Sequence, residues 1–83
     1  MERRIGSILI LIEEKSTVPE LNSLISQHAE IIIGRQGLPV RSGGIGLISL
    51  VVEGTTDQMG ALTGGLGRLP GLRVRSVVLK IGD

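Results

Sequence analysis

Four short apolar segments, rich in isoleucine, valine and leucine, limit the folds open to this chain more than any other feature. They cover residues 3–13, 31–38, 45–53 and 72–80. Segments of this length and β-branched content predict strands rather than helices. Between the first and second strands, and again between the third and fourth, apolar residues recur at helical spacing. The predicted order of elements is therefore β-α-β-β-α-β.

Both predicted helices begin with the spacing of a capping box. In this motif a threonine is followed three residues later by Glu or Gln, and each side chain bonds the other residue's backbone amide. The pairs are Thr17 with Glu20 and Thr55 with Gln58. The first helix is expected to end near residue 29 or 30, and the second to stop at the Pro-Gly pair that follows Leu69.

The second predicted helix is rich in glycine, with four glycines between Met59 and Leu69. Each glycine costs about 1 kcal/mol relative to alanine in a helix interior. Two interpretations stay open for them. The helix is either poor and frayed, or its glycines allow its backbone to approach the sheet or another chain closely.

The middle of the chain, from Gly34 to Glu53, is predicted to be a hairpin onto which the other elements fold. Residues 42–44, Ser-Gly-Gly, are a turn signal, and Pro39 belongs at a strand end or on an edge because it cannot donate a ladder hydrogen bond. Residues 34–37 match the G-x-x-G loop with which KH domains clamp a nucleic-acid backbone. That loop joins two helices, however, so the sequence favours glycines at a bulge or bend in a strand.

The compact solution for this order is a ferredoxin-like α+β sandwich, in which a four-stranded antiparallel sheet carries both helices on one face. The strand order 4-1-3-2 places the first and third strands in the middle. A chain of 83 residues has room for one domain, so residues 1–83 are expected to form a single unit.

Two helices can cover only one face of that sheet, although three strands carry apolar residues at consecutive positions. These are Leu9-Ile10-Leu11, Leu50-Val51-Val52 and Val77-Val78-Leu79. About half of them must point away from the helices, which leaves a larger apolar patch than monomers usually tolerate. Burying one such side chain contributes about 1.5–3 kcal/mol. We therefore expect a homo-oligomer that covers the open sheet face, with the third strand at the contact between subunits.

The composition argues against several classes of function. The net charge is +1, and aromatic residues are absent, so neither a dense basic face nor a stacking platform is available for nucleic acid. The longest uncharged apolar run, residues 5–12, is far shorter than the roughly 18–20 residues of a membrane span. We expect no membrane association and no cofactor. Because no carboxylate has a partnered base or nucleophile, we also expect no enzymatic activity. The absence of cysteine fits a cytoplasmic protein.

Three residues are candidates for a ligand site. Arg35 and Arg41 lie in the bend before the hairpin turn and could hold an anion, with solvated surface arginines as the alternative. His28, the only histidine, lies near the apolar face at the C-terminal end of the first predicted helix. A packed side chain, favoured by the helix dipole, is the alternative there. With one histidine and no cysteine, a metal site within one chain is not expected.

Three segments of the chain match one family in order and spacing. They are Gly-Leu-Pro-Val-Arg at 37–41, Met-Gly-Ala-Leu-Thr-Gly-Gly-Leu-Gly at 59–67, and Pro-Gly-Leu-Arg-Val-Arg-Ser-Val at 70–77. With them the whole chain resembles the iron-only hydrogenase system regulators. These are small ACT-like ferredoxin-fold proteins, similar to the C-terminal ligand-sensing domain of the nickel-responsive repressor. The resemblance implies a regulatory or ligand-sensing module that forms a dimer or tetramer, responds to an unidentified small molecule, and acts alongside the maturation or expression of iron-only hydrogenase.

The chain departs from the better-understood relatives in three respects. The nickel regulators bind metal through several histidines and a cysteine, whereas this chain has His28 alone, so nickel binding is not expected. They also carry an N-terminal DNA-binding arm, but here the first strand begins almost at Met1, so no direct DNA binding is expected. The turn after the first strand lacks the glycine of amino-acid-binding ACT domains. An assembly protein that binds a protein partner through the sheet face, without sensing a small molecule, therefore remains the alternative function.

Overall fold

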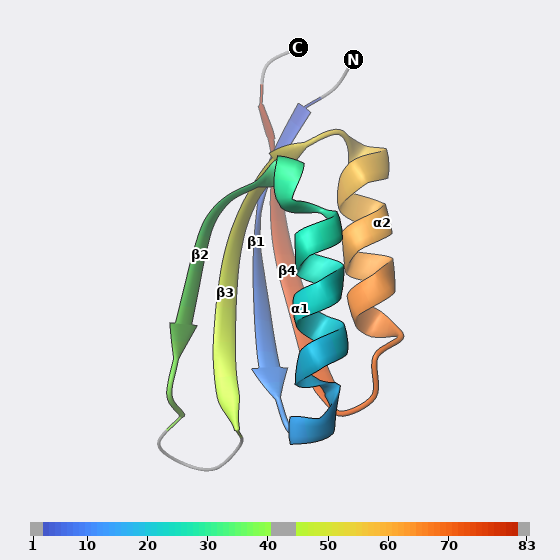
Figure 1. The fold of residues 1–83 in the computed structure, drawn as a ribbon. Coiled ribbons are helices and arrows are strands. Elements are labelled where there is room, and N and C mark those ends of the chain that lie inside the picture. The colour runs from blue at the N-terminus through green and yellow to red at the C-terminus, as the bar shows by residue number, and fades with distance from the viewer. Residues whose placement is uncertain (1–2, 41–44, 82–83) are drawn as a thin grey trace.

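The computed structural model describes residues 3–40 and 45–81, and it contains the predicted order of elements (Figure 1). The strands are β1 (Arg3–Ile12), β2 (Ile32–Leu38), β3 (Gly46–Gly54) and β4 (Leu72–Ile81). The helices are α1 (Val18–Gln27) and α2 (Thr56–Gly67), with short 3-10 turns η1 (Lys15–Thr17) and η2 (Ala29–Ile31) on either side of α1. The strands form one antiparallel sheet in the order β2-β3-β1-β4, so the predicted ferredoxin-like arrangement is confirmed.

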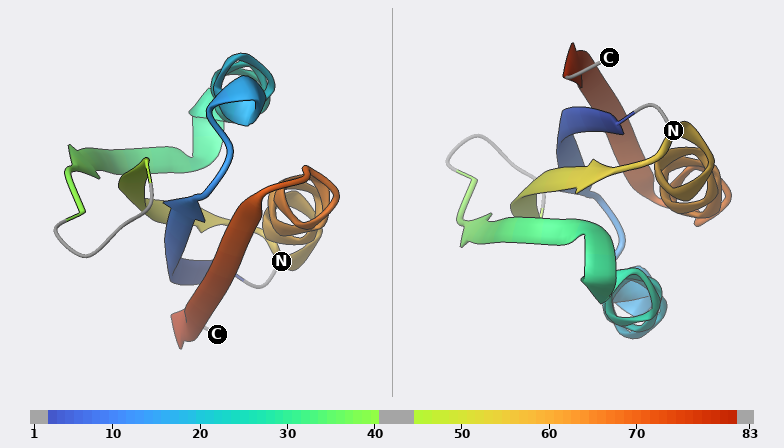
Figure 2. Two further views of the ribbon diagram at one scale, coloured as in Figure 1. Left: turned by 90° about the horizontal axis from the view of Figure 1, so that it is seen from below. Right: turned by 90° about the horizontal axis from the view of Figure 1, so that it is seen from above.

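Both helices pack on the same face of the sheet, as the two end-on views in Figure 2 show. Burial alternates along the central strands, and only the side chains that face the helices enter the core. From the sheet these are Ile8, Ile10, Ile12, Ile48, Leu50 and Val52, and from the helices Leu21, Ile25, Met59, Leu62 and Leu66. None of the described helices is long and apolar enough to cross a membrane.

The predicted central hairpin is formed by β2 and β3. Their pairing shifts register between Ile32 and Gly34, whereas β1 pairs with β3 and with β4 without a break. The interruption at the first glycine agrees with the predicted bulge. Residues 34–37 lie within β2 and join no helices, so the KH-loop interpretation is wrong. The predicted turn at residues 42–44 lies outside the described residues.

The two predicted capping boxes have different outcomes. At the start of α2, Thr55 N–H donates to Gln58 Oε1 at 2.9 Å and Gln58 N–H donates to Thr55 Oγ1 at 3.2 Å, so this capping box is confirmed. The box predicted for Thr17 and Glu20 is wrong, because Thr17 makes no side-chain cap to α1. Thr17 is instead the last residue of the η1 turn and has an α-helical backbone conformation, and its hydroxyl is used elsewhere in the fold.

The hydroxyl of Thr17 joins the two chain crossovers at one end of the sheet. It donates to the Pro70 carbonyl at 2.8 Å, although the residues are 53 positions apart, and Thr17 is only 2% exposed. Beside it, Glu13 N–H donates to the Gly71 carbonyl at 2.7 Å. Gly71 has a φ of 72°, in the left-handed region that glycine adopts without steric cost. The connection from β1 to α1 is thus bonded to the connection from α2 to β4.

The first helix ends earlier than predicted, at Gln27. His28 follows as its C-cap, and the η2 turn then carries Ile31 into the core, where it is 3% exposed. Burial of Ile31 beneath the strand end explains the early stop, because a helix continued to residue 30 would not deliver this side chain to the sheet.

One glycine of α2 lies at a close contact between the helices. A Cβ placed on Gly65 would lie 3.0 and 3.1 Å from the two methyl carbons of Leu24 in α1. A Cβ on Gly60 or Gly67 would meet nothing within 4 Å. Close backbone approach therefore explains Gly65, but the element approached is α1 rather than the sheet. The helix runs unbroken from Thr56 to Gly67.

Two neighbouring glycines give a matched test of this contact. Gly64→Ala should raise the free energy of unfolding by about 1 kcal/mol, because the new methyl meets only the Arg68 side chain, at 3.6 Å. Gly65→Ala should raise the free energy of unfolding by less than this or should lower it, because the Leu24 side chain must shift to admit the methyl group. Urea denaturation at one protein concentration measures both. Equal stabilisation by the two substitutions would contradict the close packing of α2 on α1.

The Thr17 hydrogen bond can be tested by a substitution of the same shape. Thr17→Val keeps the volume but leaves the Pro70 carbonyl without its donor, which should lower the free energy of unfolding by about 1–3 kcal/mol. Thr17→Ser, which keeps the hydroxyl, is the control and should retain the hydrogen bond. A Thr17→Val protein as stable as the parent would show that the bond contributes nothing.

Candidate functional site: the open face of the sheet

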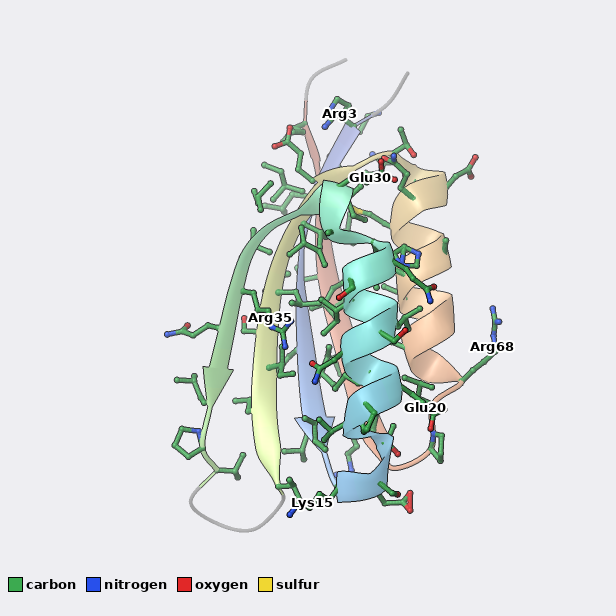
Figure 3. All side chains as sticks on the ribbon, viewed as in Figure 1. Arg3, Lys15, Glu20, Glu30, Arg35 and Arg68 are labelled. Atoms are coloured by element: carbon green, nitrogen blue, oxygen red, sulfur yellow. The ribbon has the colours of Figure 1, made fainter. Side chains whose placement is uncertain are left out.

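The arginine predicted to hold an anion contacts the chain's own helix. Arg35 lies in β2 on the side of the sheet that faces the helices, and Figure 3 shows its side chain directed from the strand toward α1. Its Nη2 donates to Asn22 Oδ1 at 2.9 Å. The guanidinium therefore already has one partner within the chain. Arg41, the second predicted residue, lies outside the described residues.

His28 is a half-buried helix cap. Its Nδ1 lies 3.1 Å from the carbonyl oxygen of Leu24, one turn earlier in α1. Arg35 bonds the side chain of Asn22, whereas His28 bonds the backbone of Leu24, so the two candidates have separate partners on α1. In the described part of the chain, no three His, Asp or Glu side chains are grouped so that they could hold a metal ion.

The larger candidate site is the side of the sheet that carries no helix, called the open face here. Strand register defines its rows: Leu11 lies opposite Leu47, Ser7 opposite Val51 and Val77, and Ile5 opposite Leu79. Several of its apolar side chains are solvent-exposed, including Leu9 at 48%, Val77 at 68% and Leu79 at 62%. Apolar side chains thus extend over the three strands β3, β1 and β4.

Most charges of the open face lie at its two ends. At one end Arg3 Nη2 lies 3.5 Å from Glu53 Oε2, and at the other Arg73 Nε lies 3.3 Å from Glu13 Oε1. Exposed pairs of this kind contribute at most about 1 kcal/mol to stability. Between these ends, Leu9 lies opposite Arg75 on one side and Ser49 on the other, and the next row carries Val51 and Val77. A largely aliphatic patch that includes an arginine fits a protein–protein interface, where arginine is enriched.

A second candidate site is a groove on the helix side of the sheet, between α2 and the edge strand β4. This groove has a volume of about 190 Å³ and is lined by Arg4, Thr56, Met59, Gly60, Thr63, Ser76 and Val78. Val78 of this wall is 46% exposed although it points to the helix side. No motif in the sequence indicated this groove. The run of apolar residues at 77–79 was the one hint, because consecutive strand residues alternate between the two faces and one of them therefore lies on the helix side.

Comparisons with known proteins agree with this geometry. A family model matches residues 4–76, and its family is TM1266-like, with the description "Iron-only hydrogenase system regulator, putative". Among solved structures, the uncharacterized protein TM1266 from Thermotoga maritima is 32% identical, with a TM-score of 0.84 over 96% of this chain and 100% of its own. No curated protein matches the chain.

More distant structures share the fold alone. The ACT domain of a GTP pyrophosphokinase from Chlorobium tepidum is 16% identical, with a TM-score of 0.69 over 93% of this chain and 100% of its own. CPII, a nitrogen regulatory PII-like protein from Thiomonas intermedia K12, is 15% identical, with a TM-score of 0.58 over 99% and 100%. The fold is therefore ACT-like, and the family match and the 32% identity to TM1266 show that the chain belongs to the TM1266-like family.

Proposed function

We propose that this chain is a non-enzymatic regulatory module of the iron-only hydrogenase system that works as a homo-oligomer, with the open faces of two subunits packed together. The observation that carries the proposal is the open face itself. Leu9 lies at its centre, with half of its surface in water and Val51 and Val77 in the adjacent row. Water contact at such side chains is unfavourable by about 25 cal/mol per Å² of apolar area.

The total surface of the chain supports an assembly. Its accessible area is 5285 Å². Monomeric proteins of 8.8 kDa expose about 4,800 Å², so this chain exposes several hundred Å² more than a monomer of its mass. Stable interfaces bury about 800 Å² on each partner. Covering the open face would remove an area of this order from water.

The regulatory part of the proposal rests on the family and on the neighbouring folds. The family description names a regulator, and one neighbouring structure of CPII holds ADP, AMP and bicarbonate. Small anionic metabolites are accordingly the first ligands to test. The scaffold alternative also has support, because Arg35 and His28, the described candidates for a ligand contact, each bond to α1 of their own chain.

Leu9→Lys should dissociate the face-to-face assembly. Each interface would lose two buried leucine side chains and gain two charges, so the dissociation constant should rise at least about 100-fold. Light scattering across a dilution series measures this. Gln27→Lys, which adds the same charge at an exposed position of α1, is the control and should leave the mass unchanged. A parent protein that is monomeric at micromolar concentration would end the proposal.

A thermal-shift panel of adenine nucleotides, bicarbonate, amino acids and divalent metals separates sensing from scaffolding. A ligand at 100 times its dissociation constant stabilises the folded state by about 2.7 kcal/mol, which raises the melting temperature measurably. A rise with one class of ligand is the expected result. If every compound leaves the melting temperature unchanged, the sensing role is wrong and the scaffold function is favoured.

A further inference from the structure

The sheet has two edges, and they differ in regularity. At the β2 edge the ladder shifts at Gly34, and Gly37 and Pro39 follow near the strand end. Bulges and proline are devices that prevent an edge from pairing with another strand. β4 pairs with β1 from Leu72 to Ile81 without a register shift, and it contains no glycine or proline. It is the edge suited to further pairing.

Two contacts show which backbone groups of β4 point outward. A Cβ placed on Gly6 in β1 would lie 3.4 Å from the Val77 carbonyl oxygen, so that oxygen faces β1. The Val74 carbonyl instead accepts a 2.8 Å hydrogen bond from Arg75 Nη1 at the exposed edge. Because the backbone groups of successive strand residues point to opposite sides, residues 74, 76, 78 and 80 present their N–H and C=O groups outward.

Side chains on both faces of this edge are exposed as well. Val77 and Leu79 lie on the open face at 68% and 62% exposure, and Val78 lies on the helix side at 46%. Covering the open face alone would leave Val78 in water. A strand added beside β4 would shield all three, since its side chains flank both faces of the edge.

We propose that β4 pairs antiparallel with β4 of a second copy, with the two-fold axis at Val77, which joins two sheets into one of eight strands. In this register the outward groups of Ser76 meet those of Val78 of the partner subunit. Val77 then faces Val77 of the partner subunit across a non-hydrogen-bonded pair, where Cα atoms are about 4.5 Å apart. All residues from Arg73 to Ile81 find a partner.

The positive charges exclude registers with the axis nearer the start of β4 and are compatible with an axis at Val77. With the axis at Val77, Arg75 lies opposite Leu79 of the partner subunit, and Arg73 opposite Ile81 of the partner subunit. An axis at Arg75 would place that arginine opposite its own copy, and an axis at Val74 would place Arg73 opposite it. Like charges directly opposite one another destabilise a strand pair. The long stems of the arginines instead cover aliphatic side chains.

The same pairing extends the groove beside α2. Ser76 and Val78 form its strand wall, and Val78 of the partner subunit would lie next to Ser76 at its open side. Gly60 leaves space on the helix above, because a Cβ there would meet nothing within 4 Å. A strand can therefore be added at β4 without a clash against that position of α2.

Single cysteines test the register directly, because the chain has none of its own. Val77→Cys should form a covalent dimer on oxidation or with a short bis-maleimide, since both thiols sit on the axis. Leu79→Cys is the matched control on the same strand and face. Its two copies would be four residues apart along the pair, about 13 Å, and should stay monomeric in denaturing gels.

Two further substitutions separate edge pairing from packing of the open faces. In the Val77→Cys background, Ser76→Pro removes an outward N–H without touching the ladder to β1, and it should abolish the cross-link, whereas Ser76→Ala should keep it. Leu9→Lys, which breaks the face-to-face contact, should also keep it. Circular dichroism checks that each variant is folded.

Three results would overturn the proposal. These are no cross-link by Val77→Cys, a cross-link that survives Ser76→Pro, and a cross-link that disappears with Leu9→Lys. The last would assign the contact to the open faces and leave the proposed face-to-face assembly standing.

Discussion

The structure depends on the fact that the two helices cover only one of the two faces of the sheet. Four strands rich in aliphatic residues present two apolar faces, and two helices bury only one of them. On the buried side the match is close, since Ile8, Ile10, Leu50 and Val52 are at most 1% exposed. On the other side, no helix among residues 3–40 and 45–81 covers Leu9 and its neighbours, and Leu9 is 48% exposed. In a chain of this size, the net stability is a small difference between large terms. The contact of these apolar side chains with water is therefore a large unfavourable contribution to the free energy of the isolated subunit.

The fold was predictable from the sequence because its signals are local and repeated. Strand length, helical spacing and the Thr55–Gln58 box depend only on neighbouring residues, and all three agree with the structure. The same signal at Thr17 failed because Thr17 belongs to the η1 turn and has a right-handed helical backbone (φ −85°, ψ −13°), whereas Thr55 has the extended backbone of an N-cap. The helix end at Gln27 was missed because the burial of Ile31 depends on where the strand ends.

The candidate site was predictable only in part. Consecutive apolar residues in a strand indicate burial on both sides, which identified the open face. The partners of Arg35 and His28 depend on how α1 lies across the sheet, and no local pattern contains that information. The groove beside β4 depends on the sideways position of α2, which is set in part where Gly65 packs against Leu24. The glycines of the second helix indicate that a close backbone contact is possible, but they do not indicate which element makes it.

The bonds between the two crossovers have a consequence for how the domain comes apart. A β-α-β-β-α-β chain consists of two similar β-α-β halves, and in principle one half could separate from the other as the chain unfolds. Here Thr17 and Glu13 of the first half hold the Pro70-Gly71 corner of the second. Neither half can open at this end without breaking the other's contacts. Opening either half at this end would therefore break hydrogen bonds that tie the start of α1 to the root of β4.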